Sequence, residues 1–253
     1  MKTTFNIILF GETGVGKSSL INLIAGREVA KTSGDSNACT MAYRPYLFEV
    51  HDVTYSIWDT RGFDEADTAM SARGYLAAVE QAYKLIRDLA DKGGVDLLVH
   101  CHREGRITTT TRCNYRLFYE VLCESKVPVA LVVTFLERHA RMEDWWEQNV
   151  EIFAKHEMKA AAHACVTGLS GHSKSQESKR AIEDMLGHHD DNGRYSMPSE
   201  QWFSQFLRRW IATRGCPNGL KESELEVFLR KRCGLGVRDA HDIASILAKG
   251  RDR

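Results

Sequence analysis

GETGVGKS, residues 11–18, is the stretch of this chain that decides its fold. It follows a short apolar run, FNIILF (5–10), and precedes SSLINLIAG (18–26), which has helical spacing and ends at a glycine. Glycines allow the backbone to curl so that successive N–H groups point at one anion, and the following helix adds its positive N-terminal end. The sequence therefore predicts a phosphate-binding loop between a buried strand and a helix.

Two side chains at the end of this stretch have chemistry suited to a nucleotide bound with a metal ion. The Lys17 ammonium can bridge the β- and γ-phosphates, and the Ser18 hydroxyl can ligate Mg²⁺. We expect nucleotide contacts from Gly11, Glu12, Thr13, Gly14, Val15, Gly16, Lys17, Ser18 and Ser19.

A second motif, WDTRG (58–62), lies at the end of the strand-like text TYSIWDT. The Asp59 carboxylate can hold the Mg²⁺ shell, and the Gly62 N–H can approach a γ-phosphate closely because no side chain intervenes. A nucleotide switch also needs a hydroxyl in the polar loop before the next strand, and Thr40 lies closest to that strand. The expected catalytic set is Lys17, Thr40 and Gly62, and the expected metal ligands are Ser18, Thr40 and Asp59.

Apolar runs and helical patterns alternate along the first three quarters of the chain. With the phosphate-binding loop after its first strand, this order predicts a three-layer α/β P-loop domain, with a mostly parallel sheet and one antiparallel edge strand from the hairpin over 44–60. We expect this domain over 1–195 and a C-terminal helical extension over 196–253. Further strands are expected at 95–101, 128–134 and 161–167, and further helices at 71–92, 112–124, 142–157 and 178–189. His100, Cys101 and His102, at the end of the strand expected at 95–101, look like a metal cluster. Their spacing suits no common zinc site without distant ligands, so we interpret them as a loop beside that strand.

Composition narrows the class of protein. Lys plus Arg equals Asp plus Glu at 34 each, so no basic field indicates a nucleic-acid partner. The seven dispersed cysteines are typical of reduced thiols, and no apolar stretch approaches the roughly 20 residues that span a bilayer. We expect a cytoplasmic protein; the basic and aromatic text near the C-terminus leaves contact with anionic lipid open without supporting it.

VVTFLE (132–137) occupies the place where a base-reading loop is expected. Glu137 offers a bidentate carboxylate that matches the N1–H and 2-amino donors of guanine, Thr134 supplies a polar group, and the Phe135 ring can stack on a base. Thr167 and Gly168, after the last expected strand, are candidates for contacts to the guanine carbonyl oxygen. The alternative is that Glu137 only begins a charged loop leading into a helix.

Together, GETGVGKSS, a loop threonine, DTRG and a strand ending in VVT resemble GTPases of the translation-factor-related P-loop class. The resemblance covers roughly residues 4–190 and looks closest to immunity-associated and septin-like GTPases and to uncharacterised fungal G-domain proteins. It implies a Mg²⁺-dependent GTP-binding domain with nucleotide-sensitive loops at 27–44 and 60–74.

One residue departs from the pattern of Ras-like GTPases. Phe63 follows DTRG, where those proteins have a glutamine that orients the attacking water, so we expect slow hydrolysis of GTP to GDP or stimulation by a partner. A homodimer across the nucleotide face is one hypothesis for the source of the missing group. The alternatives are a GTP-dependent assembly or scaffold protein with little hydrolysis, and a P-loop ATPase.

Overall fold

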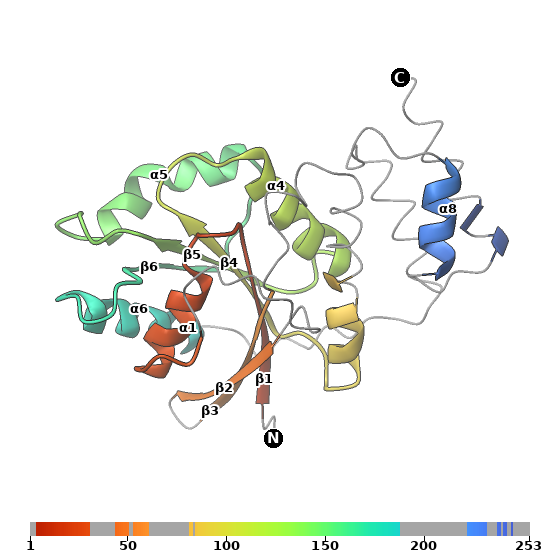
Figure 1. Ribbon diagram of the computed structural model, residues 1–253. Coiled ribbons are helices and arrows are strands. Elements are labelled where there is room, and N and C mark those ends of the chain that lie inside the picture. The colour runs from red at the N-terminus through yellow and green to blue at the C-terminus, as the bar shows by residue number, and fades with distance from the viewer. Residues whose placement is uncertain are drawn as a thin grey trace.

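The computed structural model describes residues 4–30, 44–50, 53–60, 81–82, 84–187, 222–231, 237–238, 240–241 and 244. Within them the chain forms a six-stranded sheet flanked by helices (Figure 1). Its strands are β1 (Thr4–Phe10), β2 (Arg44–Val50), β3 (Val53–Asp59), β4 (Leu97–Arg103), β5 (Val129–Thr134) and β6 (Ala162–Cys165).

The sheet has the order β2-β3-β1-β4-β5-β6. β2 pairs antiparallel with β3 at one edge, and β1, β3, β4, β5 and β6 are parallel to one another. The predicted α/β fold, with a mostly parallel sheet and one antiparallel edge strand, is therefore confirmed.

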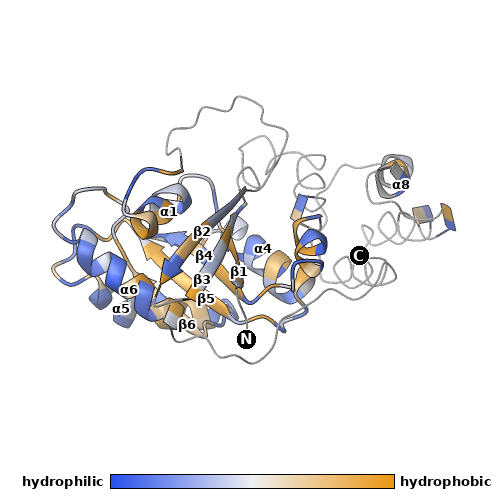
Figure 2. Cartoon of the chain, turned by 90° about the horizontal axis from the view of Figure 1, so that it is seen from below, coloured by the Kyte–Doolittle hydropathy of each residue, from blue (hydrophilic) through white to orange (hydrophobic). Residues whose placement is uncertain are grey.

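Side chains of the central strand alternate between two hydrophobic cores, one on each face of the sheet. Ile7 and Leu9 pack with α1 (Lys17–Ala25) and α6 (Ser175–Gly187). Ile8 and Phe10 face the other core, which is the larger one. That core is covered by α4 (Thr109–Tyr115), the π-helix η1 (Arg116–Leu122) and α5 (Glu143–Lys155). Figure 2 shows the resulting layers, an apolar sheet between helices with hydrophilic outer sides.

The interpretation of 100–102 as loop residues was wrong. β4 extends to Arg103, because it pairs in register with β5 as far as the contact of Arg103 with Thr134. His100 is fully buried and stacks on the ring of Phe10, with 4.7 Å between ring centroids. An aromatic contact of this kind lets a histidine ring occupy a core position that periodicity would reserve for an aliphatic side chain.

The helix expected over 112–124 begins three residues earlier than its pattern indicates. Thr108 caps it, because the Thr111 N–H donates to the Thr108 hydroxyl oxygen over 2.9 Å. Its second half, η1, is wound as a π-helix, in which the Cys123 N–H reaches the Phe118 carbonyl five residues back.

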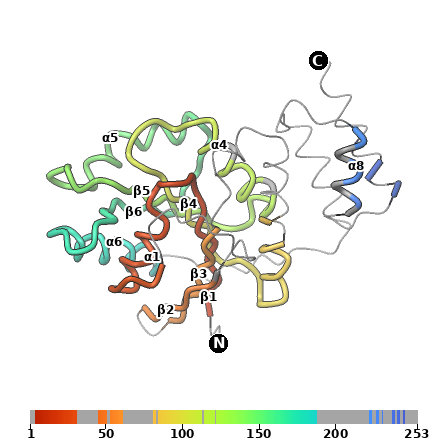
Figure 3. The backbone as a smooth tube through the Cα atoms, viewed as in Figure 1, coloured from red at the N-terminus to blue at the C-terminus, as the bar shows by residue number. Residues whose placement is uncertain are grey.

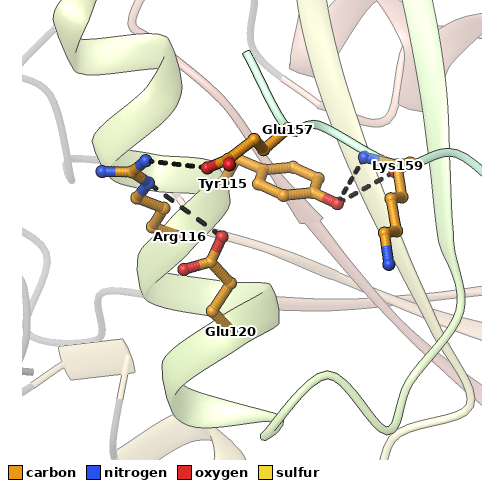
Figure 4. A network of polar contacts seen from close by, with 5 residues as sticks. All are labelled: Tyr115, Arg116, Glu120, Glu157 and Lys159. Carbon is orange, nitrogen blue, oxygen red and sulfur yellow. Dashed lines mark hydrogen bonds and ion pairs between the residues drawn. The ribbon is translucent and has the colours of Figure 1, made fainter. Parts of the chain in front are cut away.

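A polar network fixes the junction of α4 and η1 to the loop before β6 (Figure 4). The Tyr115 hydroxyl donates to the Lys159 carbonyl over 3.0 Å and accepts from the Lys159 N–H over 2.8 Å. Arg116 lies 3.5 Å from the Glu157 carboxylate and 4.0 Å from that of Glu120. The tyrosine contact is half-buried and therefore carries more of the stabilisation than the exposed ion pairs.

Beyond residue 187, the structure describes α8 (Glu222–Lys231) and a few residues that follow it. Ala240 and Ala244 among these are fully buried and belong to the larger core. The division at residue 195 stays a prediction. None of the helices in the described ranges is long and apolar enough to cross a membrane.

Candidate functional site

The carboxyl ends of the five parallel strands meet at one edge of the sheet. β1 and β4 are neighbours in the sheet, but the connection from β1 leads toward β2 and β3 on one side, and the connection from β4 leads toward β5 on the other. The carboxyl ends of β1 and β4 therefore form the topological switch point of this open α/β sheet. Ligands bind such folds in the crevice outside this edge. At this edge the motif over 11–18 follows β1, Asp59 ends β3, Thr134 ends β5 and leads into the loop to Glu137, and Thr167 and Gly168 follow β6.

The loop between β1 and α1 folds back tightly against β4. Figure 3 follows this reversal of the chain from β1 into α1. Gly11 has φ 143°, and a Cβ there would lie 2.2 Å from the carbonyl oxygen of Cys101. No other residue fits at this position, because both the left-handed backbone and the close approach require glycine. The neighbouring Cys101 thiol donates to the Val15 carbonyl over 3.4 Å.

The Lys17 ammonium lies across this loop. It donates to the carbonyls of Gly11 and Glu12 over 2.6 and 2.8 Å, and so remains within the turn that the glycines form. Ser18 follows in the first turn of α1, half-buried. The arrangement offers a phosphate group backbone N–H donors, a helix N-terminus and the Lys17 cation in one place.

Asp59 ends β3 directly beside β1. The Cα register pairs Leu9 with Asp59, and Asp59 is only 1% exposed. Thr60, which follows, donates from both its N–H and its hydroxyl to the Leu9 carbonyl, over 3.2 and 2.9 Å. A carboxylate fixed in this way beside β1, whose following loop leads to Ser18, suits the shell of a hydrated Mg²⁺ ion.

The loop after β5 contacts the phosphate loop through Thr134. Its hydroxyl lies 2.7 Å from the Val15 carbonyl and 3.2 Å from the His102 carbonyl, and its side chain is 1% exposed. The Thr134 hydroxyl therefore donates to main-chain carbonyls, and its contact with Val15 connects the end of β5 to the phosphate loop.

Phe135 adopts a left-handed backbone conformation, φ 66°, that is rare for an aromatic residue. A Cβ added at Gly16 would lie 3.6 Å from its ring, so the ring edge reaches the phosphate loop. The Arg103 guanidinium carbon lies 4.1 Å from the ring centroid, a close cation–π contact. Strained residues of this kind concentrate at ligand sites, and a half-buried ring here offers a surface for stacking a base.

Glu137 and the loop after β6 come together at the same edge. The Thr167 hydroxyl donates to the Glu137 carboxylate over 3.2 Å, and the Leu136 N–H donates to the Val166 carbonyl over 3.3 Å. A Cβ on Gly168 would lie 2.8 Å from that of Ser19, so glycine is needed for the loop to pack against α1.

The structure thus brings together all the predicted site residues that it describes, from Gly11 to Ser19, Asp59, Thr134, Phe135, Glu137, Thr167 and Gly168. Thr40 and Gly62 lie outside the described residues, as does Phe63. Their roles stay predictions.

Sequence reasoning missed two sets of contacts. Arg103, at the end of β4, was not singled out, although its place at a strand end on this edge was a usable signal. The second set joins Glu12 to Thr108 and Thr111, whose hydroxyls both donate to the Glu12 carboxylate.

Among the residues that the structure describes, the histidines of β4 belong to no group of three His, Cys, Asp or Glu that could hold a metal ion. Burial, together with the charges of His102 and Lys17, lowers the pKa of His100 to about 3, so the ring is neutral. Burial raises the pKa of the Cys101 thiol to about 12, which keeps it unreactive as a protonated thiol.

Comparisons with known proteins agree with this geometry. Curated relatives include GTPase Der of Campylobacter curvus, 24% identical over 96% of this chain and 49% of that protein. The Ras-related protein rab-11.1 of Caenorhabditis elegans is 32% identical over 38% of this chain and 53% of that protein. The chain thus spans about half the length of these relatives.

Solved structures share the fold. Era of Aquifex aeolicus, bound to GDP and aluminium fluoride, superposes with a TM-score of 0.52 at 13% identity, over 96% of this chain and 87% of that one. Toc33 of Arabidopsis thaliana superposes with a TM-score of 0.51 at 17% identity, over 76% and 88% of the two chains.

A family model described as 50S ribosome-binding GTPase matches residues 6–135, more than half of the chain. This range begins in β1 and includes the phosphate loop, Asp59, and the loop after β5 as far as Phe135. The chain therefore belongs to this family of GTP-binding GTPases.

Proposed function

We propose that this chain binds GTP and GDP together with Mg²⁺ and hydrolyses GTP to GDP and phosphate. The proposal rests on one observation: a loop suited to phosphate and a pair of side chains suited to a base lie at the same edge of the sheet. The loop with Lys17 is suited to phosphates, and the paired Glu137 and Thr167 side chains are suited to a base. The Thr134 hydroxyl connects the two through the Val15 carbonyl.

Guanine rather than adenine is the base that this arrangement favours. A carboxylate only accepts hydrogen bonds, and guanine presents two adjacent donors where adenine presents an acceptor at N1. The hydrogen bond from Thr167 occupies one part of the Glu137 carboxylate and orients the rest. A P-loop ATPase would have no use for a carboxylate at this position, so ATP is the weaker candidate.

Metal binding rests on the residue types that the edge supplies. The Asp59 carboxylate and the Ser18 hydroxyl are hard oxygen donors, which suit Mg²⁺ bound also by phosphates and water. Thr40, which lies outside the described residues, completes the proposed metal set, and the Gly62 N–H is proposed to contact the γ-phosphate. Mg²⁺ would neutralise phosphate charge, while Lys17 and the loop N–H groups orient the γ-phosphate.

We infer slow intrinsic hydrolysis, because Phe63 cannot hydrogen-bond the attacking water. Dimerisation is described as important for the GTPase activity of the chloroplast translocon components Toc33 and Toc159, and that structure has a TM-score of 0.52 here. In a homodimer across the nucleotide face, the second protomer would supply the group that orients the attacking water. The resemblance to immunity-associated and septin-like GTPases supports such a dimer. The second candidate, a GTP-dependent scaffold with little hydrolysis, is favoured by the same phenylalanine.

Single-turnover phosphate release separates the two candidates. GTP is mixed with an excess of protein at increasing concentration, with Mg²⁺, and Lys17→Met serves as the control without a phosphate-binding cation. A rate that rises steeply with protein concentration supports dimer-stimulated hydrolysis. Bound GTP that remains intact at every concentration, in a protein that does assemble, establishes the scaffold instead.

A further inference from the structure

Glu12 places a negative charge in a loop that is suited to phosphate. Like charges a few ångströms apart repel each other at a protein surface, so the position of the Glu12 carboxylate matters for nucleotide affinity. The structure shows where the carboxylate lies: both the Thr108 and the Thr111 hydroxyls donate to its Oε1 atom. We name Glu12, Thr108 and Thr111 the Glu12 latch.

The two threonines are prearranged for this contact. Their hydroxyl oxygens are 3.0 Å apart, and each accepts a backbone N–H of the other, over 2.9 Å for Thr108 and 3.3 Å for Thr111. Thr111 is only 2% exposed. This reciprocal arrangement fixes both hydroxyls at the start of α4 and aims them at one carboxylate oxygen.

The main chain of Glu12 is held at the same time. Its carbonyl accepts the Lys17 ammonium over 2.8 Å and the Val15 N–H over 3.4 Å. The residue therefore connects the phosphate loop to α4 through its side chain, and to the phosphate-binding lysine through its backbone.

We propose that Thr108 and Thr111 are positioning residues for nucleotide binding, which hold the Glu12 carboxylate at α4 and away from the loop N–H groups. The inference rests on the proposed function, since it supposes that phosphates bind this loop. Without the hydroxyls, the carboxylate is free to turn toward the phosphate site, where it repels the ligand and leaves the loop less ordered. The proposal therefore predicts that removing the Glu12 charge restores the nucleotide affinity that is lost when a threonine hydroxyl is removed.

A simple capping role predicts something different. Thr108 caps α4 through the Thr111 N–H, so its replacement would weaken the helix whatever Glu12 does. Thr111→Val is the sharper variant, because it removes a hydroxyl that donates to Glu12 and keeps the shape of the side chain. Thr109→Val is the matched control: its exposed hydroxyl accepts only a long 3.4 Å contact from Arg112.

The test is a set of titrations with fluorescent GDP and Mg²⁺. We expect Thr111→Val to weaken binding about tenfold, Thr111→Ser to restore most of it, and Thr109→Val to bind within about twofold of wild type. In a Glu12→Gln background, the same valine substitution should cost less than about twofold, so that the double variant binds more tightly than Thr111→Val alone.

Equal losses from Thr111→Val in both backgrounds would overturn the latch, as would unchanged affinity in a folded Thr111→Val. Thermal unfolding without nucleotide establishes that each variant folds, and Thr111→Ala replaces the valine variant if that one does not. Failure of the wild-type protein to bind fluorescent GDP would instead refute the proposed function itself. That outcome is distinct from a wild type that binds while its threonine variants are unaffected.

Discussion

The phosphate side and the base side of this edge are built in different ways. The phosphate side is a single stretch, 11–19, whose shape comes from glycine backbone geometry and one lysine. The base side is assembled from side chains of separate loops, with Glu137 and Thr167 thirty residues apart in sequence. Backbone donors recognise any phosphate, whereas a placed carboxylate distinguishes between bases, so we expect affinity from the first and selectivity from the second.

The largest effect should come from the phosphate side. Lys17→Met removes the ammonium that lies across the loop and should weaken GTP, GDP and ATP alike, by about a hundredfold, because the lost contacts are charge-assisted. Titration calorimetry with the three nucleotides measures this. A loss confined to GTP would show that the two sides are not separable in this way.

The second largest loss of affinity should come from Glu137 on the base side. Glu137→Gln places an amide donor opposite the donors of guanine and should weaken GDP binding about thirtyfold while leaving ADP binding unchanged. Competition between the two nucleotides for a fluorescent analogue gives the ratio directly. Glu137→Asp, which keeps the carboxylate, is the control. An equal loss for both nucleotides would mean that the residue supports the loop and does not read the base.

Removal of Mg²⁺ should again affect the phosphate side alone. Chelation should speed release of GDP about tenfold, because the β-phosphate would lose the divalent ion that we propose Ser18 and Asp59 bind. The guanine-over-adenine ratio should not change. Stopped-flow release of fluorescent GDP and ADP, with and without chelator, measures both quantities. If the guanine-over-adenine ratio fell when Mg²⁺ was removed, the metal would contribute to base selection, and the two sides would not have separate roles.

The smallest effect should come from Arg103. Arg103→Ala removes the cation from the Phe135 ring and should weaken all purine nucleotides about threefold, since exposed cation–π contacts are modest. The same substitution in a Phe135→Ala background should have no further effect. Additive losses in that double variant would assign Arg103 a role independent of the ring.

Much of this architecture was predictable from local pattern. The alternation of apolar runs and helical spacing indicated the sheet and its antiparallel edge, because each signal depends on neighbouring residues alone. The full length of β4 was not predictable. His100 and His102 are polar by type, and contacts with aromatic rings from distant segments make them core residues. His100 stacks on Phe10, and His102 meets the Phe153 ring edge-on.

Residues of the site were likewise predictable where they are contiguous in sequence, and not where their roles depend on distant segments. The phosphate loop is contiguous, so its residues could be named from the sequence. The roles of Thr134 and Thr108 depend on contacts with Val15 and Glu12 across about a hundred residues or more, which spacing cannot reveal. The Arg103–Phe135 contact likewise requires the parallel register of β4 and β5.

The central claim is that this edge binds nucleotides and selects guanine through Glu137. Calorimetric titration of the wild-type protein with GTP and with ATP, in Mg²⁺, tests it most directly. The account predicts that GTP binds about a hundredfold more tightly than ATP, since ATP would leave the carboxylate without its donors. Equal affinities for GTP and ATP would contradict it.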